Sequence, residues 1–217
     1  MYISLLNISV QTICLAVAWR YLRNDKERHW VLQPWYLLVV VLTEGIGGYI
    51  GIVQGKNNLW LYNIFLLIEG TFISYFIYRI CKPYGLRVRY WWLWMALFIA
   101  CFAAEHFFAS RPLAYPFWTV IWISTSFIAG SIYYTYQLFK APPQPMPLHR
   151  HAPSIWMGAV SCFYFGTFVT TLLAEPLITA QVDLAGLPLY ALIYLLLNLM
   201  LYGLWTVTFM YRYRNRH

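Results

Sequence analysis

Two glutamates stand alone in stretches of sequence that are otherwise apolar. Glu44 lies in VLTEGIGGYIGIVQG and Glu69 lies in LYNIFLLIEGTF. Each follows the edge of its apolar stretch by about ten residues, and since a helix rises about 1.5 Å per residue, both should lie near the middle of a membrane. A carboxylate facing lipid at that depth is costly, so we expect both to point into a helix bundle. Such a group can carry a proton, pair with a cationic ligand or join helices by hydrogen bonds.

Polar and aromatic side chains on other stretches fall at a similar depth or on the same predicted helix faces. Gln11 lies midway along the first apolar stretch, and Asn198 lies midway along the last. Helical spacing places Asn198 in an aromatic stripe, and Tyr164 lies in a comparable stripe on the preceding stretch. If the second, third, sixth and seventh helices are neighbours, these groups line a polar pocket with aromatic walls that opens toward the outer half. The residues expected at this site, with Asn63 at its mouth or as a helix cap, are Gln11, Glu44, Asn63, Glu69, Tyr164, Tyr194, Asn198, Tyr202 and Trp205.

Glycines follow Glu44 at helical intervals. Gly48, Gly51 and Gly55 come four, seven and eleven residues after it. On one regular helix these positions share a face, which predicts that another backbone approaches there or that the helix bends.

No lysine, arginine or histidine falls at the depth of the two acids. Burial without a basic partner favours the neutral form of a carboxyl group, so we expect at least one of the two glutamates to hold a proton near neutral pH. Other chemistry finds little support, because His106 is the one histidine in the apolar stretches and the four cysteines have no paired spacing. We therefore expect no catalytic residues, metal or cofactor. Near His106, Glu105 and Arg111 predict an ion pair at the membrane surface.

The composition identifies the elements that must position these residues. Hydrophobic residues make up 61% of the chain and charged residues 10%, which is typical of an all-α integral membrane protein. Little sequence is left for a soluble domain, so residues 1 to 217 are expected to form a single seven-helix domain, with the first helix retained. The expected spans are residues 2–20, 34–54, 59–79, 90–109, 115–138, 154–173 and 188–210.

Basic residues predict the orientation of the chain. Of the 15 lysines and arginines, 13 follow the first, third, fifth and seventh spans, whereas Lys56 and Arg111 are alone on the other side. Basic residues beside a span stay in the cytoplasm, so the amino terminus should be outside and the carboxyl terminus inside. The net charge of +8 then suits membrane lipids of the inner leaflet and needs no nucleic acid. A bacterial inner membrane or another plasma membrane is the expected location.

The arrangement of three helices, a linker helix and three helices resembles the layout of sugar transporters. LYNIFLLIEG from Leu61 and LYALIYLLLN from Leu189 both begin inward-running helices and place Glu69 and Asn198 at nearly equal depth. Such repeats suit transport, and we expect a proton- or cation-linked transporter of a small polar or cationic solute. One alternative is a seven-helix receptor that senses a ligand and acts through a cytoplasmic or membrane partner protein. The other is a structural membrane protein without catalysis.

Overall fold

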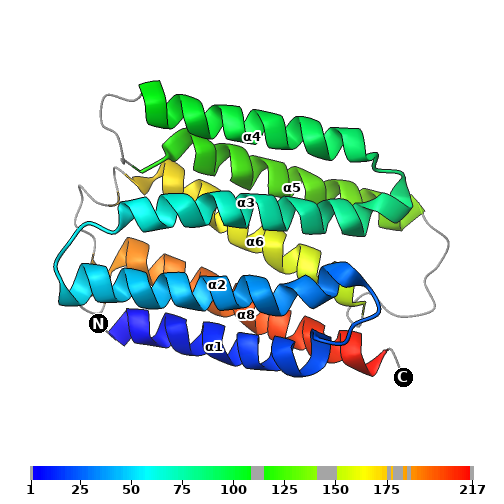
Figure 1. Cartoon of the computed structure of the whole chain (residues 1–217), viewed down its shortest axis with the longest axis horizontal. Coiled ribbons are helices and arrows are strands. Elements are labelled where there is room, and N and C mark those ends of the chain that lie inside the picture. The colour runs from blue at the N-terminus through cyan, green and yellow to red at the C-terminus, as the bar shows by residue number, and fades with distance from the viewer. Residues whose placement is uncertain are drawn as a thin grey trace.

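The computed structural model is a bundle of long helices that run alongside one another (Figure 1). It describes residues 2–108, 115–140, 151–174, 177, 183–184 and 187–215. The long helices are α1 (Tyr2–Leu22), α2 (Arg28–Gly48), α3 (Leu59–Cys81), α4 (Val88–Phe108), α5 (Phe117–Lys140), α6 (Ala152–Leu172) and α8 (Leu189–Arg214). The shorter elements are a π-helix, η1 (Tyr49–Val53), a 3-10 helix, η2 (Lys82–Tyr84), and two strands, β1 (Asp183–Leu184) and β2 (Leu187–Pro188). The strands pair antiparallel, Asp183 with Pro188 and Leu184 with Leu187.

Five of these helices are long and apolar enough to cross a membrane, among the residues that the structure describes. They are α1, α2 extended by η1, α3 extended by η2, α6 and α8. This is the helical make-up of a multi-pass membrane protein.

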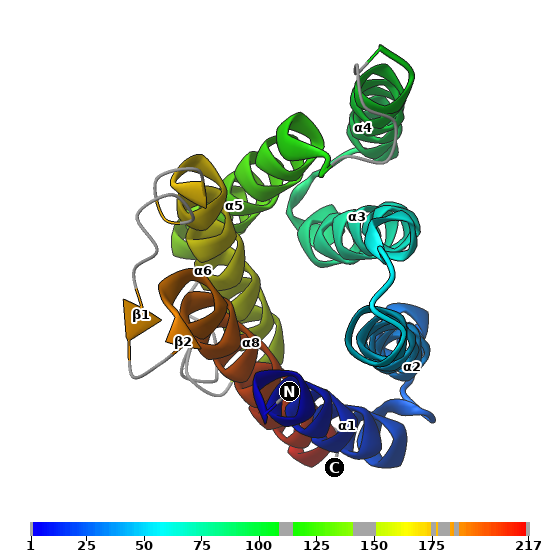
Figure 2. The ribbon, with the colours of Figure 1, turned by 90° about the vertical axis from the view of Figure 1, so that its left-hand side faces the viewer.

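The helices form a ring when viewed end-on (Figure 2). Consecutive helices α1, α2 and α3 are in contact, as are α5, α6 and α8, and each set of three forms one side of the ring. Contacts between α1 and α8 close the ring at one end, and contacts between α3 and α5 close it at the other. Helix α4 lies outside the ring and packs on α3 and α5. The side chains that could form an internal site must therefore come from the six ring helices.

Large aromatic side chains fill much of the ring. Trp30, Trp156 and Trp205 are completely buried and belong to three different helices, α2, α6 and α8. Small residues allow close helix contacts around them: a Cβ on Gly166 of α6 would collide with Leu197 of α8. Glycine at such a position lets two helices approach in a membrane.

The second helix differs from its expected course at both ends. It begins at Arg28, six residues before the expected span, and runs through Pro34. At its C-terminal end it becomes the π-helix η1, which has a wider turn than an α-helix, so Gly48, Gly51 and Gly55 do not share one regular helix face as predicted. Gly55 lies in the following turn with φ of +63°, a conformation that favours glycine.

Candidate functional site

Glu69 of α3 points toward the other side of the ring. The hydroxyl group of Tyr164 on α6 donates a hydrogen bond of 2.9 Å to Glu69 Oε1. Protein atoms crowd around the carboxyl group, but part of the residue's surface remains accessible. This bond joins the α1–α3 side of the ring to the α5, α6, α8 side at the level of the acid.

Two more tyrosines surround the same carboxyl group. Tyr36 of α2 and Tyr202 of α8 both lie within electrostatic range of Glu69, and both are buried. Tyr36 is held by stacking on Phe72, with ring centroids 4.2 Å apart and planes at 3°. Trp205 meets both tyrosines edge to face, at 6.2 Å from Tyr36 and 5.8 Å from Tyr202. The central cluster is therefore a carboxyl group among three phenol groups, contributed by four helices.

Glu44 forms a second polar pair, nearer the C-terminal end of α2. The Tyr62 hydroxyl group donates to Glu44 Oε2 at 3.3 Å. Gly47 makes room for this contact, because a Cβ there would lie 2.7 Å from the Tyr62 hydroxyl oxygen. Glu44 is close enough to Glu69 for the two carboxyl groups to interact electrostatically.

Gln11 extends the cluster to α1. It is 1% exposed, and its side-chain amide lies beside Tyr202. Its Oε1 atom has no hydrogen-bond partner within the described residues. Buried amide oxygens are seldom left in that state, so this atom is suited to bind water or a ligand.

The structure brings together six of the nine residues expected at the site: Gln11, Glu44, Glu69, Tyr164, Tyr202 and Trp205. Asn198 is half-buried on α8 and, in the part of the chain described, makes no hydrogen bond to the cluster. Tyr194 instead bonds the Tyr115 side chain, which itself lies within electrostatic range of Glu69.

Asn63 was expected to lie at the mouth of the pocket or to cap α3, and the structure shows it in neither role. Its side-chain nitrogen lies 3.1 Å from His106 Nε2 on α4, so it faces the outer helix and away from the ring. Asn63 comes six residues before Glu69, which places it about 120° around α3 from the acid and on the side that meets α4.

Tyr62 and Tyr36 were missed by the sequence analysis. Tyr62 comes seven residues before Glu69, which is two turns of the same helix face, so helical spacing could have found it. Tyr36 stands beside Trp35 near the inner edge of the expected span, where aromatic residues ordinarily mark the membrane surface.

Glu105, which was expected in an ion pair with Arg111, accepts hydrogen bonds at the start of α5. Its two carboxylate oxygens accept bonds from the backbone N–H groups of Trp118 and Thr119, at 2.8 and 2.9 Å, and from the Thr119 hydroxyl group at 2.7 Å. These donors form the first turn of α5, where backbone N–H groups need acceptors. Arg111 lies outside the described residues.

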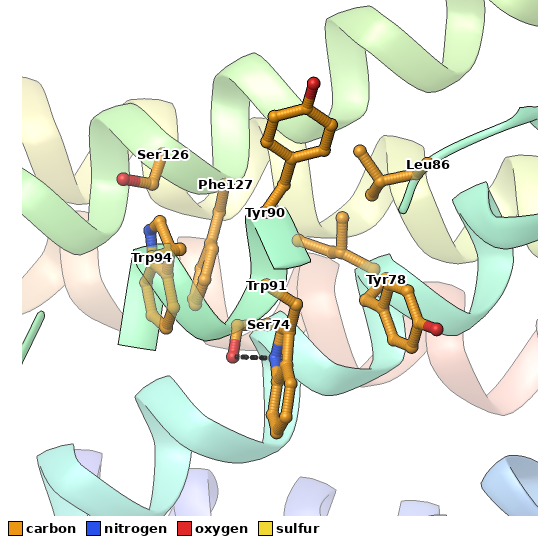
Figure 3. Close-up of a pocket in the computed structure, with 9 residues that line it drawn as sticks. Ser74, Tyr78, Leu86, Tyr90, Trp91, Trp94, Ser126 and Phe127 are labelled. Atoms are coloured by element: carbon orange, nitrogen blue, oxygen red, sulfur yellow. Dashed lines mark hydrogen bonds between the residues drawn. The ribbon is translucent and has the colours of Figure 1, made fainter. Parts of the chain in front are cut away.

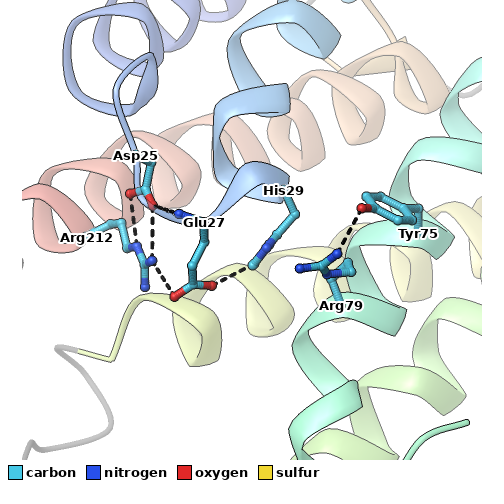
Figure 4. Close-up of polar contacts among 6 residues, drawn as sticks. All are labelled: Asp25, Glu27, His29, Tyr75, Arg79 and Arg212. Carbon is cyan, nitrogen blue, oxygen red and sulfur yellow. Dashed lines mark hydrogen bonds and ion pairs between the residues drawn. The ribbon is translucent and has the colours of Figure 1, made fainter.

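Ion pairs in the described ranges gather at the end of the ring where the α1–α2 loop meets the C-terminal end of α8 (Figure 4). Arg212 of α8 bonds both oxygens of Asp25, each at 3.2 Å, and Glu27 at 2.6 Å. The Asp25 side chain is fully buried. This clasp, formed by Asp25, Glu27 and Arg212, holds the loop between α1 and α2 against the end of α8. No ion pair involves Glu69 or Glu44 among the residues described.

A separate cavity of about 150 Å³ lies between α3, α4 and α5 (Figure 3). Its walls are mainly aromatic and include Trp94 and Phe127, and its polar contact is the Trp91 indole N–H that donates to Ser74 at 3.2 Å. It lies on the outer side of the ring and shares no residue with the central cluster.

The cluster consists of a carboxyl group with phenol groups around it. No group of three metal-ligating side chains occurs within the described part of the chain. Comparison of the sequence and structure with known protein families, curated proteins and solved structures finds no match.

Proposed function

We propose that the chain is a seven-helix membrane transporter that moves a small polar or cationic solute together with a proton carried by Glu69. In this proposal α4 and α5 also cross the membrane, since they are 21 and 24 residues long and run alongside α3 (Figure 1). The amino terminus is outside and the carboxyl terminus is in the cytoplasm, as the distribution of basic residues favours.

The observation that carries the proposal is the bond between Tyr164 and Glu69 across the ring. An ionisable group inside a membrane is expensive and marks function more often than structure. Here the acid sits among hydroxyl groups that stabilise both of its protonation states, and no ion pair fixes it as a permanent anion.

The position of this bond suggests how a proton could control movement. It connects the two three-helix sides of the ring, so a change in the charge of Glu69 changes the strength of the contact between them. Transporters built from two helix sets move one set against the other around a site near the membrane midplane. The π-helix η1 at the outer end of α2 is an irregularity of the kind often found at functional sites.

Gradient-driven uptake tests the proposal. Purified protein in liposomes with an inward proton gradient is given three radiolabelled mixtures, of amino acids, of amines including choline, and of sugars. We expect one mixture to accumulate, to leak out when a protonophore collapses the gradient, and to be lost with Glu69→Gln.

The matched control is Glu105→Gln, which alters an acid outside the ring and leaves an oxygen to cap α5. It should retain accumulation. If the parent protein binds a labelled compound but never accumulates it, the transport proposal fails and the receptor alternative is favoured. If Glu69→Gln accumulates solute as well as the parent does under the same gradient, Glu69 is not the proton carrier.

A further inference from the structure

His29 occupies the inner end of α2 with its two ring nitrogens in different surroundings. Nε2 lies 3.3 Å from Glu27 Oε2 (Figure 4). Nδ1 is buried and has no hydrogen-bond partner in the described residues, and the whole residue is only 4% exposed. One nitrogen therefore faces a carboxylate, and the other is buried without a protein partner among the described residues.

Glu27 connects this histidine to the inner surface. Its side chain is 50% exposed, whereas the His29 side chain is 6% exposed. Its other oxygen accepts a bond from Arg212, which holds the carboxylate in place. A proton that reaches Glu27 can therefore leave to water without any helix movement.

Unpartnered polar atoms continue from His29 toward the central cluster. Gln33 lies one turn farther along the same face of α2, is completely buried, and has no partner for either amide atom among the described residues. The indole nitrogens of Trp156 and Trp205 are also buried without a hydrogen-bond partner among the described residues. The two indoles stack with ring centroids 5.5 Å apart. Trp205 in turn contacts Tyr36, which lies beside Glu69.

Buried polar atoms without protein partners are the positions at which proteins hold internal water, provided that two or more lie within reach of one molecule. His29, Gln33 and Tyr36 follow one another at helical spacing on one face of α2, and this face runs from the Glu27 carboxylate to the surroundings of Glu69. Hydrogen-bonded chains of this kind carry protons, and a histidine with two differently placed nitrogens is the usual relay.

We propose that His29 and Glu27 form a second proton-binding site, through which protons pass between Glu69 and the inner surface. This inference rests on the proposed function. His29 accepts a proton at Nδ1 from the interior and releases the proton of Nε2 to Glu27. The imidazole thus gains one proton, loses one and returns to the neutral state. Rotation of the His29 side chain then turns Nε2, now unprotonated, away from Glu27 and brings Nδ1–H to it, so that the next proton can follow.

The charges around His29 are balanced, which suits repeated transfer. Glu27 and Asp25 of the loop between α1 and α2 face it, and Arg79 of α3 and Arg212 of α8 oppose them. The two negative and two positive charges offset one another. Phe76 packs edge to face on the imidazole at 5.1 Å.

The rate at which Glu69 takes up a proton tests the relay. In nanodiscs, a pH jump is followed by time-resolved infrared spectroscopy of the carboxylic C=O band, which Glu69→Gln assigns to Glu69. The measurements are made with Glu44→Gln, so that the outer acid does not supply protons. We expect His29→Phe to slow the protonation of Glu69 by about a hundredfold, the low end of what a positioned proton-transfer group contributes.

Two further variants make the result decisive. His29→Gln keeps polarity and approximate size but cannot be protonated, and it should slow uptake similarly if the phenylalanine variant fails to fold. His106→Gln, on the outer helix α4, should leave the rate unchanged.

If His29→Gln protonates Glu69 as fast as the parent protein does, the relay is overturned. The pH-dependent band of Glu69 is then still present, and the proposed function stands. A parent protein with no pH-dependent Glu69 band overturns both.

Discussion

Tyr164→Phe removes a single hydroxyl group from the central cluster. The ring of Tyr164 is buried and meets Phe127 edge to face at 4.8 Å, and phenylalanine retains that packing. What is lost is the 2.9 Å bond to Glu69. The substitution therefore measures one interaction between α6 and α3.

The expected magnitude depends on the charge of Glu69. Hydrogen bonds between membrane helices contribute about 0.6 kcal/mol on average and at most about 1.7 kcal/mol. Bonds to a charged group contribute about 1.5 to 3 kcal/mol. Since we propose that Glu69 holds a proton near neutral pH, Tyr164→Phe should lower the free energy of unfolding by about 1 kcal/mol, in the neutral range.

Glu69→Gln supplies the reference for this measurement. Glutamine imitates the protonated acid, because it keeps a carbonyl oxygen that accepts the Tyr164 bond and carries no charge. Tyr164→Phe should therefore cost about as much in the Glu69→Gln background as in the parent protein, to within about 0.5 kcal/mol. Reversible unfolding in mixed bicelles, followed by tryptophan fluorescence, measures all four proteins.

Two results would refute the reasoning. If Tyr164→Phe costs the parent protein about 1 kcal/mol more than it costs the glutamine variant, Glu69 is ionised at neutral pH. If it costs nothing in either background, the two side chains do not share a hydrogen bond.

Three further predictions concern other parts of the fold. Gly47→Ala should lower the free energy of unfolding by about 1 to 3 kcal/mol, because the new methyl group displaces Tyr62, while Gly48→Ala, which meets no atom within 4 Å, should not. Glu105→Ala should cost about 1 to 3 kcal/mol by removing the cap of α5, and Glu105→Gln should cost less, as bicelle unfolding can show. Burial lowers the pKa of His151 below its ordinary value of 6.5, so its contribution to stability is complete above that pH and is lost on acidification. Between neutral pH and about pH 5, the free energy of unfolding should therefore fall less in His151→Gln than in the parent protein.

The positions of the long helices could be predicted from the sequence because apolar stretches of that length have few other structures available in a membrane. The start of α2 could not, since hydropathy marks the apolar layer and not the helix, and the helix continues through polar residues to Arg28. The π-helix that ends it has no signal in helical periodicity, which is why the glycine face was wrong.

The central cluster was predictable to the extent that depth and helix face determine it. The position of Glu69 along its apolar stretch predicted that it lies near the midplane. Helical spacing predicted that Tyr164 and Tyr202 lie on the sides of their helices that face the bundle. Which helices are neighbours is not encoded in either quantity, so Asn63 was assigned to the pocket although it faces α4. His29 was overlooked because it lies beside a charged loop, and its burial results from the packing of α3 and α6 aromatic residues above it.

The central claim is that Glu69 exchanges a proton inside the ring, and an infrared titration tests it most directly. Difference spectra of the parent protein, Glu69→Gln and Glu44→Gln are recorded in nanodiscs as the pH is raised from neutral. We expect a carboxylic C=O band in the parent at neutral pH that disappears at higher pH, persists in Glu44→Gln and is absent from Glu69→Gln. A parent spectrum with no such band, which means that both glutamates are ionised at neutral pH, would contradict the account.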